Sequence, residues 1–120
     1  MSKPILLIVE SKDFLANVIE EHLSRDFDCM WVSSVERAIE FIPNADAAVV
    51  SGNVFSGRYP GRGALLTALK KVKDVPIIAL TTTQTSSARI ELFESGADDV
   101  MTKPFNPVEL GLRMKRLVKK

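Results

Sequence analysis

The sequence predicts an α/β protein built on a doubly wound parallel sheet. Five short apolar runs alternate with five amphipathic stretches along the 120 residues. Two of the runs, Ile5–Val9 and Ile77–Leu80, are apolar throughout, as expected for parallel strands that are buried on both faces. Connections between parallel strands are right-handed, so we expect helices on both faces of the sheet. The length predicts one domain, residues 1–120, that buries about two thirds of its unfolded surface.

The first strand is expected over Ile5–Val9 and is followed by a helix with Ser11 as its N-cap. Apolar residues in this helix recur at helical spacing and form one stripe, which comprises Phe14, Leu15, Val18, Ile19 and Leu23. The second strand is expected over Cys29–Ser33. A helix over Val35–Ile42 follows, and Pro43 ends it because proline has no backbone N–H to donate.

The third strand is expected over Ala47–Ser51, and the glycine-rich loop Gly57–Gly63 then leads into a helix over Ala64–Val72. This loop does not have the spacing of a phosphate-binding motif, so we interpret it as a flexible cover over the neighbouring pocket. The remaining elements are a strand over Ile77–Thr81, a helix over Ser87–Ser95 ended by Gly96, a strand over Asp99–Thr102, and a helix over Pro107–Val118 with proline in its first turn.

Composition excludes several classes of protein. No apolar run approaches the roughly 20 residues that span a bilayer, and no secretory signal is visible, so we expect no membrane association. The single cysteine, Cys29, cannot form a disulfide framework; this fits the reducing cytoplasm and a packing role. Residues 1–60 hold five Lys/Arg and nine Asp/Glu, and residues 61–120 hold eleven and six, so the halves carry −4 and +5. The basic charges are interleaved with apolar residues, which favours a solvated helix face over a nucleic-acid surface.

Polar residues stand at the carboxyl ends of four predicted strands. Ligands of open α/β sheets bind at this edge. The residues there are Glu10-Ser11, Ser51-Gly52-Asn53, Thr81-Thr82 and Lys103-Pro104.

These strand ends, together with the stretch Gly96-Ala97-Asp98-Asp99-Val100-Met101-Thr102-Lys103-Pro104-Phe105, resemble the receiver domains of response regulators (CheY-like). The resemblance covers essentially the whole chain and is strongest to the OmpR/PhoB type. It implies a three-layer, flavodoxin-like (βα)5 fold with strand order 2-1-3-4-5, and a signalling domain of a two-component phosphorelay rather than an enzyme. In this family the first strand ends in two acids that hold Mg²⁺, the third in a phosphorylated aspartate, the fourth in Thr or Ser, and the fifth in lysine before a cis-proline.

The chain departs from that pattern at the site of phosphorylation. Glu10 keeps one acid of the first strand, whereas Ser11 stands where the other would be. Ser51 takes the position of the phosphorylated aspartate; a register slip would put Gly52 there, which also has no carboxylate. Asn53, Thr81 and Lys103 match the family. The resemblance therefore implies a pseudo-receiver: Glu10 is the one weak candidate ligand for a metal, and Mg²⁺ is not expected to bind well.

Ser51 is not expected to replace the lost aspartate as a nucleophile. A serine hydroxyl needs a neighbouring general base, and the only histidine, His22, lies in the first helix. We expect no metal-dependent phosphorylation here.

Lys103 needs a counterion if it is buried. We hypothesise an ion pair between Glu10 and Lys103; the alternative is that Lys103 extends to solvent. Val100 occupies the strand position where the family has an aromatic residue that moves on activation, so this relay is expected to be weakened.

A second resemblance concerns the surface through which OmpR/PhoB-type receivers form two-fold dimers. It lies on the fourth helix, fifth strand and fifth helix, and the matching residues carry the right charges: Arg89 with Glu109, Asp99 with Arg113, Glu94 with Lys115, and Asp98 with a basic residue near Lys120. Glu109 and Arg113 could instead pair within one helix. Trp31, on the second strand, either packs against a helix or anchors a partner.

The sequence thus indicates a phosphorylation-independent regulatory module that forms a homodimer or docks on a protein partner. It could control an output domain, for example one that binds DNA. Three alternatives stay open: a receiver with a displaced acidic acceptor such as Glu10 or Asp13, a small enzyme or flavin-binding protein on the same fold, and a direct nucleic-acid binder.

Overall fold

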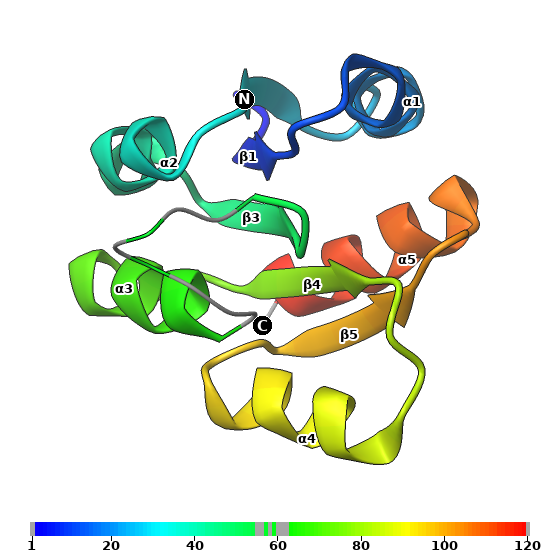
Figure 1. Cartoon of the computed structure of the whole chain (residues 1–120). Coiled ribbons are helices and arrows are strands. Elements are labelled where there is room, and N and C mark those ends of the chain that lie inside the picture. The colour runs from blue at the N-terminus through cyan, green and yellow to red at the C-terminus, as the bar shows by residue number, and fades with distance from the viewer. Residues whose placement is uncertain (1, 55–56, 58, 60–62, 120) are drawn as a thin grey trace.

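The computed structural model describes residues 2–54, 57, 59 and 63–119. Five parallel strands form one sheet in the order β2-β1-β3-β4-β5, and helices cover both faces (Figure 1). The predicted α/β fold and strand order are therefore confirmed. The elements in chain order are β1 Ile5–Val9, α1 Asp13–Leu23, β2 Asp28–Val32, α2 Val35–Phe41, the 3₁₀ turn η1 Ile42–Asn44, β3 Ala47–Ser51, α3 Ala64–Val72, β4 Ile77–Thr81, α4 Ser86–Glu94, β5 Asp99–Thr102 and α5 Pro107–Val118.

Each central strand sends alternate side chains into two separate cores. On one face Leu6 and Ile8 pack with α1 and α5. On the other face Leu7 and Val9 pack with α2, α3 and α4. Both faces of β1, β3 and β4 are covered, which explains why these strands lack the polar alternation of a half-exposed sheet. Trp31 lies instead on the edge strand β2, where its side chain is 41% exposed.

The start of α1 differs from expectation. Ser11 is not the N-cap: the helix begins at Asp13, and Lys12 takes the N-cap position without a side-chain hydrogen bond. The physical reason is that the Glu10 carboxylate fixes this turn: the Lys12 N–H donates to one of its oxygens at 3.0 Å. The Asp13 carboxylate in the first turn complements the helix dipole.

Smaller differences from the expected boundaries have local causes. Strand β2 runs one residue earlier than expected because Asp28 pairs in register with Ile5. Helix α2 gives way to the 3₁₀ turn at Ile42, next to Pro43. Helix α4 begins at Ser86, since the Thr85 hydroxyl accepts the Ala88 N–H. Gly96 follows α4 with a φ of 120°, which confirms its role at the helix end.

Within the described ranges, no helix is long and apolar enough to cross a membrane.

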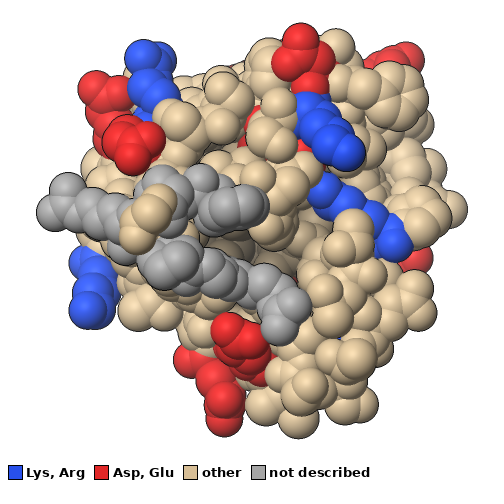
Figure 2. Space-filling model, viewed as in Figure 1, with Lys and Arg blue, Asp and Glu red and all other residues tan. Residues whose placement is uncertain are grey.

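Burial, with the nearby Glu20 and Asp28 carboxylates, raises the pKa of Cys29 to about 11, which agrees with a packing role. On the face shown in Figure 2, basic and acidic side chains lie close to one another along the upper part. Most of the Gly57–Gly63 loop lies outside the described residues.

Candidate functional site at the carboxyl edge of the sheet

The predicted strand-end residues converge at one edge of the sheet. Glu10 directly follows β1, Ser51 ends β3, Thr81 ends β4, and Lys103 directly follows β5. Glu10, Ser51 and Thr81 are buried polar residues. Parallel strands bring these groups together although they lie up to 93 residues apart in sequence.

Glu10 is the centre of this site. Its side chain is fully buried, and the Lys103 ammonium lies 3.2 Å from its Oε1 atom. Its other oxygen, Oε2, accepts hydrogen bonds from the Asn53 amide at 2.7 Å and from the Lys12 N–H at 3.0 Å. Only 12% of the Lys103 side chain is exposed. The hypothesis of a Glu10–Lys103 ion pair is confirmed, and the alternative that Lys103 extends to solvent is wrong. We call Glu10 with these three donors the Glu10 hub.

The pKa of Glu10 reflects this environment. Burial by itself raises the pKa of the carboxyl group, because it removes water from the charged form. The side chains of Ser51 and Asn53, the Lys12 N–H and the charge of Lys103 together outweigh that effect. The pKa of Glu10 therefore lies below its ordinary value, and Glu10 is ionised at neutral pH.

Acid should weaken the fold through this group. Since the pKa of Glu10 is lower in the folded than in the unfolded chain, its ionisation stabilises the fold above the ordinary glutamate pKa. The contribution is lost as the pH falls through the folded-state pKa. We expect the melting temperature of the wild type to exceed that of Glu10→Gln by a constant amount near neutral pH, and the gap to shrink below the ordinary glutamate pKa. Thermal unfolding of both proteins followed by circular dichroism measures this gap, and a gap that is unchanged in acid would contradict the expectation.

Ser51 lies next to the Glu10 hub but makes no hydrogen bond to it. Its side chain is 1% exposed, and among the described residues its Oγ atom is a buried polar atom with no hydrogen-bond partner. The Ser51 side chain helps to lower the pKa of Glu10, although its Oγ atom does not meet the geometry of a hydrogen bond. No histidine accompanies it, since His22 lies on α1 with its Nδ1 atom 2.9 Å from the Val18 carbonyl oxygen.

Thr81 and Val100 are both held inside the fold. The Thr81 hydroxyl accepts the Thr83 N–H at 3.1 Å, and Thr81 is 3% exposed. Val100, on the neighbouring strand β5, is 2% exposed and belongs to the core that packs against α2, α3 and α4. A valine has neither an aromatic ring nor a hydroxyl group. Even if Val100 moved outward, it would therefore present few contacts to a partner protein.

A cleft of about 290 Å³ opens above the hub. Its polar lining consists of Lys12, Asn53, Thr81, Thr82, Thr83 and Lys103. We call it the strand-end cleft. The sequence analysis did not identify Lys12 as part of this site. Its position two residues after Glu10, on the first turn beyond β1, is the signal that could have indicated it. Trp31 also touches the hub, because its indole N–H donates to the Glu10 carbonyl oxygen at 2.8 Å.

The predicted dimer residues lie on α4, β5 and α5, and Arg113 is central among them. Its guanidinium donates to both carboxylate oxygens of Asp99, at 3.1 and 2.9 Å, and to Glu109 at 3.0 and 2.8 Å. The hydrogen bonds that Arg113 donates to Asp99 and Glu109 raise the pKa of Arg113. The pairing within α5 that the spacing allows is thus present, and Asp99 shares the same arginine.

Other members of that set are placed differently. The Asp98 carboxylate accepts from the Lys70 ammonium and from the Ile77 N–H, each at 2.8 Å, so it is held within the chain. Lys115 lies 3.5 Å from Asp26, on the side of α5 that faces α1. Arg89 and the exposed Glu94 both lie on α4. Lys120 lies outside the described residues.

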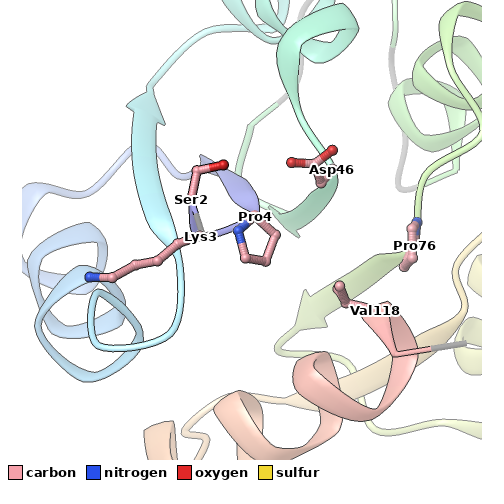
Figure 3. A pocket seen from close by; sticks show the side chains of 6 residues that line it. All are labelled: Ser2, Lys3, Pro4, Asp46, Pro76 and Val118. Atoms are coloured by element: carbon pink, nitrogen blue, oxygen red, sulfur yellow. The ribbon is translucent and has the colours of Figure 1, made fainter.

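A second hollow, of about 450 Å³, lies at the opposite edge of the sheet and is lined by residues before β1, β3 and β4 (Figure 3). Its polar groups serve the fold. The Asp46 carboxylate accepts the Ile5 N–H at 2.8 Å. The Lys3 side chain extends away from Asp46 in Figure 3 and donates to the Ser24 carbonyl oxygen. The polar groups of the site are therefore gathered at the carboxyl edge.

Comparison with known proteins places this geometry in context. A family described as the response regulator receiver domain matches residues 6–115. The chain is 33% identical over 116 residues to the transcriptional regulatory protein SrrA of Staphylococcus aureus, which covers 96% of the chain and 48% of SrrA. The chain thus spans about half the length of the curated relatives that it matches.

Solved structures are similar over the whole fold. The receiver domain of Francisella response regulator 1452 is 27% identical, with a TM-score of 0.87 over 98% of both chains. The BeF3-activated DrrB receiver domain has a TM-score of 0.88 at 21% identity, over 98% of this chain and 99% of its own. At that identity the second similarity concerns the fold alone.

Proposed function

This chain belongs to the family of response regulator receiver domains, the signalling domains of two-component systems, and we propose that it acts without being phosphorylated. In this proposal it is a regulatory module that associates through α4, β5 and α5. The observation that carries the proposal is the Glu10 hub, an internal ion pair at the strand ends where the resemblance implies the phosphorylation site.

The donor set does not suit Mg²⁺. A hard cation of this kind takes oxygen ligands, usually with carboxylates among them. Glu10 is the one carboxylate of the hub, and both of its oxygens already accept from positively charged or N–H donors. In the described part of the chain, no group of three His, Cys, Asp or Glu side chains is placed to hold a metal. Binding of Mg²⁺ would require the Lys103 ammonium to leave Glu10, which costs the burial energy of an unpaired charge.

The same geometry disfavours a displaced acceptor. Glu10 is fully buried and its oxygens are occupied, so it is poorly placed to attack a phosphoryl donor. Asp13 is exposed at the start of α1, where no hydrogen bond or ion pair joins its side chain to the hub in the described structure. A module held by its own ion pair needs no phosphoryl group to fix Lys103.

The association surface is supported by charge and by exposed apolar residues. Asp99, Glu109 and Arg113 carry one positive and two negative charges, which leaves an excess negative charge for a cation of a second copy, such as Arg89. Ile90 and Phe93, three apart on α4, are 55% and 42% exposed. Paired two-fold, these groups would give a self-complementary surface with an apolar centre. Lys115 is a weaker member, because Asp26 competes for it.

A further part of the proposal concerns the output. The match to SrrA, a transcriptional regulatory protein about twice as long as the matched region, supports control of an attached domain. In this role the dimer surface would set the spacing of two output domains, for instance on DNA.

Sedimentation equilibrium of the untreated protein tests the proposal. We expect a dimer whose dissociation constant is the same with and without Mg²⁺ and beryllofluoride, a mimic of the phosphoryl group, because Ser51 offers no carboxylate to hold it. Arg113→Glu should abolish the dimer, because it removes the cation that holds Asp99 and Glu109 in place and leaves three acids that repel one another and lose their fixed positions. Arg116→Glu is the matched control, an exposed charge reversal on the same helix.

Three outcomes would contradict the proposal. A monomer that dimerises only with the mimic would show that the phosphorylation site still works. A protein that is monomeric under both conditions, or a dimer that Arg113→Glu leaves intact, would remove the association surface from the proposal. Circular dichroism melting of each variant separates loss of association from loss of folding.

A further inference from the structure

We propose that strand β2, at one edge of the sheet, pairs with the β2 of a second copy of this chain, in an antiparallel two-fold arrangement centred on Met30. This inference goes beyond the proposed function and does not depend on it, because β2 and β5 form opposite edges of the sheet. One protomer would therefore be able to use β2 and the surface on α4, β5 and α5 at the same time.

The unpaired backbone of β2 is the first observation. The Asp28 N–H donates to the Pro4 carbonyl oxygen at 2.9 Å, so the backbone groups of Asp28 point toward β1. Backbone groups of successive residues in a strand point to opposite sides, so those of Cys29 and Trp31 point away from β1. In the described structure no other strand lies on that side of β2. The edge thus presents hydrogen-bond donors and acceptors to one further strand.

The side chains of this edge do not oppose pairing. Edge strands are commonly protected by a charge or a proline within the strand. From Cys29 to Val32, β2 contains neither. Trp31 is 41% exposed, and its orientation is fixed because the indole N–H donates to the Glu10 carbonyl oxygen at 2.8 Å. A fixed, exposed aromatic ring suits a protein contact, since it has little conformational freedom left to lose on binding.

Backbone geometry and side-chain size select the register. In an antiparallel pair, opposite residues whose backbone groups face each other exchange both of their hydrogen bonds. A two-fold axis at Met30 places Cys29 opposite Trp31 of the second copy, and the backbone groups of both point outward. The large indole then lies beside the small cysteine side chain. The two Met30 residues form the central pair without hydrogen bonds, which agrees with a backbone that points toward β1.

Charge complementarity supports a second copy as the occupant. In this register Asp28 lies opposite Val32 of the second copy, and both side chains lie on the face of the sheet that α2 covers. Arg37, on α2, lines a hollow together with Val32, so Asp28 would approach Arg37 of the second copy. The two-fold axis makes this contact twice. The Asp28 carboxylate has no hydrogen bond or ion pair in the described structure, and the ion pair of Arg37 with Glu40, at 3.5 Å, is exposed.

The contact is expected to be weak. A single pair of strand edges buries less area than a standard protein interface. Pairing through β2 would therefore be populated where the local concentration is high, and scarcely at the dilution of a sedimentation experiment. It would extend the sheet across two copies and join dimers into rows.

The first test follows the full chain carrying Arg113→Glu, which removes the association surface proposed above. Amide chemical shifts are compared over protein concentrations up to the millimolar range. We expect concentration-dependent shifts at Cys29 and Trp31, whose N–H groups gain acceptors, and smaller shifts at Met30, whose N–H faces β1. Absence of concentration-dependent shifts along β2 would overturn the proposal.

Covalent capture tests the register. Met30→Cys, combined with Cys29→Ser and Arg113→Glu, places two thiols at the central pair, where Cα atoms lie roughly 4.5 Å apart, within reach of a disulfide. With diamide as the oxidant, we expect a covalent dimer on a non-reducing gel. Lys71→Cys in the same background, at an exposed position of α3, measures random collision. The native Cys29 should not cross-link above that level, because the two Cys29 residues are offset diagonally beyond the reach of a disulfide.

Charge variants test the contact between Asp28 and Arg37. Added to the Met30→Cys chain, Arg37→Glu should lower the rate of cross-linking about fivefold, because repulsion replaces attraction at both symmetric contacts. Asp28→Lys should have a similar effect, and the two changes together should restore the rate. Both residues are exposed, so neither change is expected to unfold the protein. Circular dichroism melting checks this.

Three results of the cross-linking would also overturn the proposal. Met30→Cys could cross-link no faster than Lys71→Cys, the charge variants could leave the rate unchanged, or the native Cys29 could cross-link as readily as Met30→Cys. Should Met30→Cys fail to fold, the amide shifts of Cys29 and Trp31 still decide the question. Failure of the proposed function gives a different result, because the dimer would then be missing in sedimentation while the β2 cross-link still forms.

Discussion

Glu10→Gln is expected to lower the free energy of unfolding by about 3 kcal/mol and the melting temperature by about 10 °C. The substitution keeps the shape of the side chain but removes its charge, and so leaves the Lys103 ammonium buried without a counterion. It also weakens the two hydrogen bonds at Oε2, because an amide oxygen attracts N–H donors less than a carboxylate does. Urea unfolding at neutral pH measures the loss.

Two further variants isolate the ion pair from the rest of the change. Glu20→Gln removes an exposed glutamate on α1 and should change stability by less than about 0.5 kcal/mol. Glu10→Gln combined with Lys103→Met removes both charges, and part of the lost stability should return because no unpaired ammonium remains. If Glu10→Gln melts at the wild-type temperature, the pair is not what holds this edge of the sheet.

Ser51→Asp is expected to destabilise the protein by about 2 kcal/mol when no divalent metal is present. It buries a second carboxylate beside Glu10, where a single lysine balances the charge. Repulsion raises the pKa of one of the two acids. Because that folded-state pKa is then higher than the unfolded one, the penalty is present above the raised pKa and disappears as the pH falls from there to the ordinary aspartate pKa.

Mg²⁺ should reverse the effect of Ser51→Asp and leave the wild type unchanged. With two carboxylates at the site the oxygen donors suit a hard cation, so the melting temperature of Ser51→Asp should rise with added Mg²⁺. Ser51→Ala is the control for the lost hydroxyl, and its effect should be below about 1 kcal/mol, because Oγ has no hydrogen-bond partner among the described residues and is one of several groups that lower the pKa of Glu10. A wild type that is stabilised by Mg²⁺ as strongly as Ser51→Asp would show that Glu10 alone suffices as an anionic ligand.

Much of the fold follows from the sequence because apolar periodicity reports burial directly. The five strands and five helices were predictable in this way, whereas their order in the sheet was implied by the resemblance to receiver domains and the role of Gly96 by its residue type. The residues at which the helices and strands begin and end were less predictable. Ser11 has the chemistry of an N-cap, yet Glu10 fixes the next turn by accepting the Lys12 N–H, and a local pattern cannot show such a competitor.

The candidate site was predictable where charge balance leaves one solution. Lys103 needs a counterion, and Glu10 is the acid that the topology brings to the same edge, so their pairing could be inferred before the structure. The partners of Asp98 could not be inferred from the sequence. Its carboxylate is taken by Lys70, 28 residues away on α3, and sequence spacing contains no signal for a contact between two different helical units. The same holds for the Lys115–Asp26 pair.

The Glu10 hub also has a consequence for folding kinetics. Its contacts join residues 43 and 93 positions apart. Forming them therefore requires the closure of long loops, and the chain loses this conformational entropy before the contacts contribute any stabilising free energy. Such contacts are expected to form after the rate-limiting step. Loss of the ion pair would then accelerate unfolding and leave the refolding rate almost unchanged, so that Glu10 and Lys103 act mainly by prolonging the lifetime of the native state.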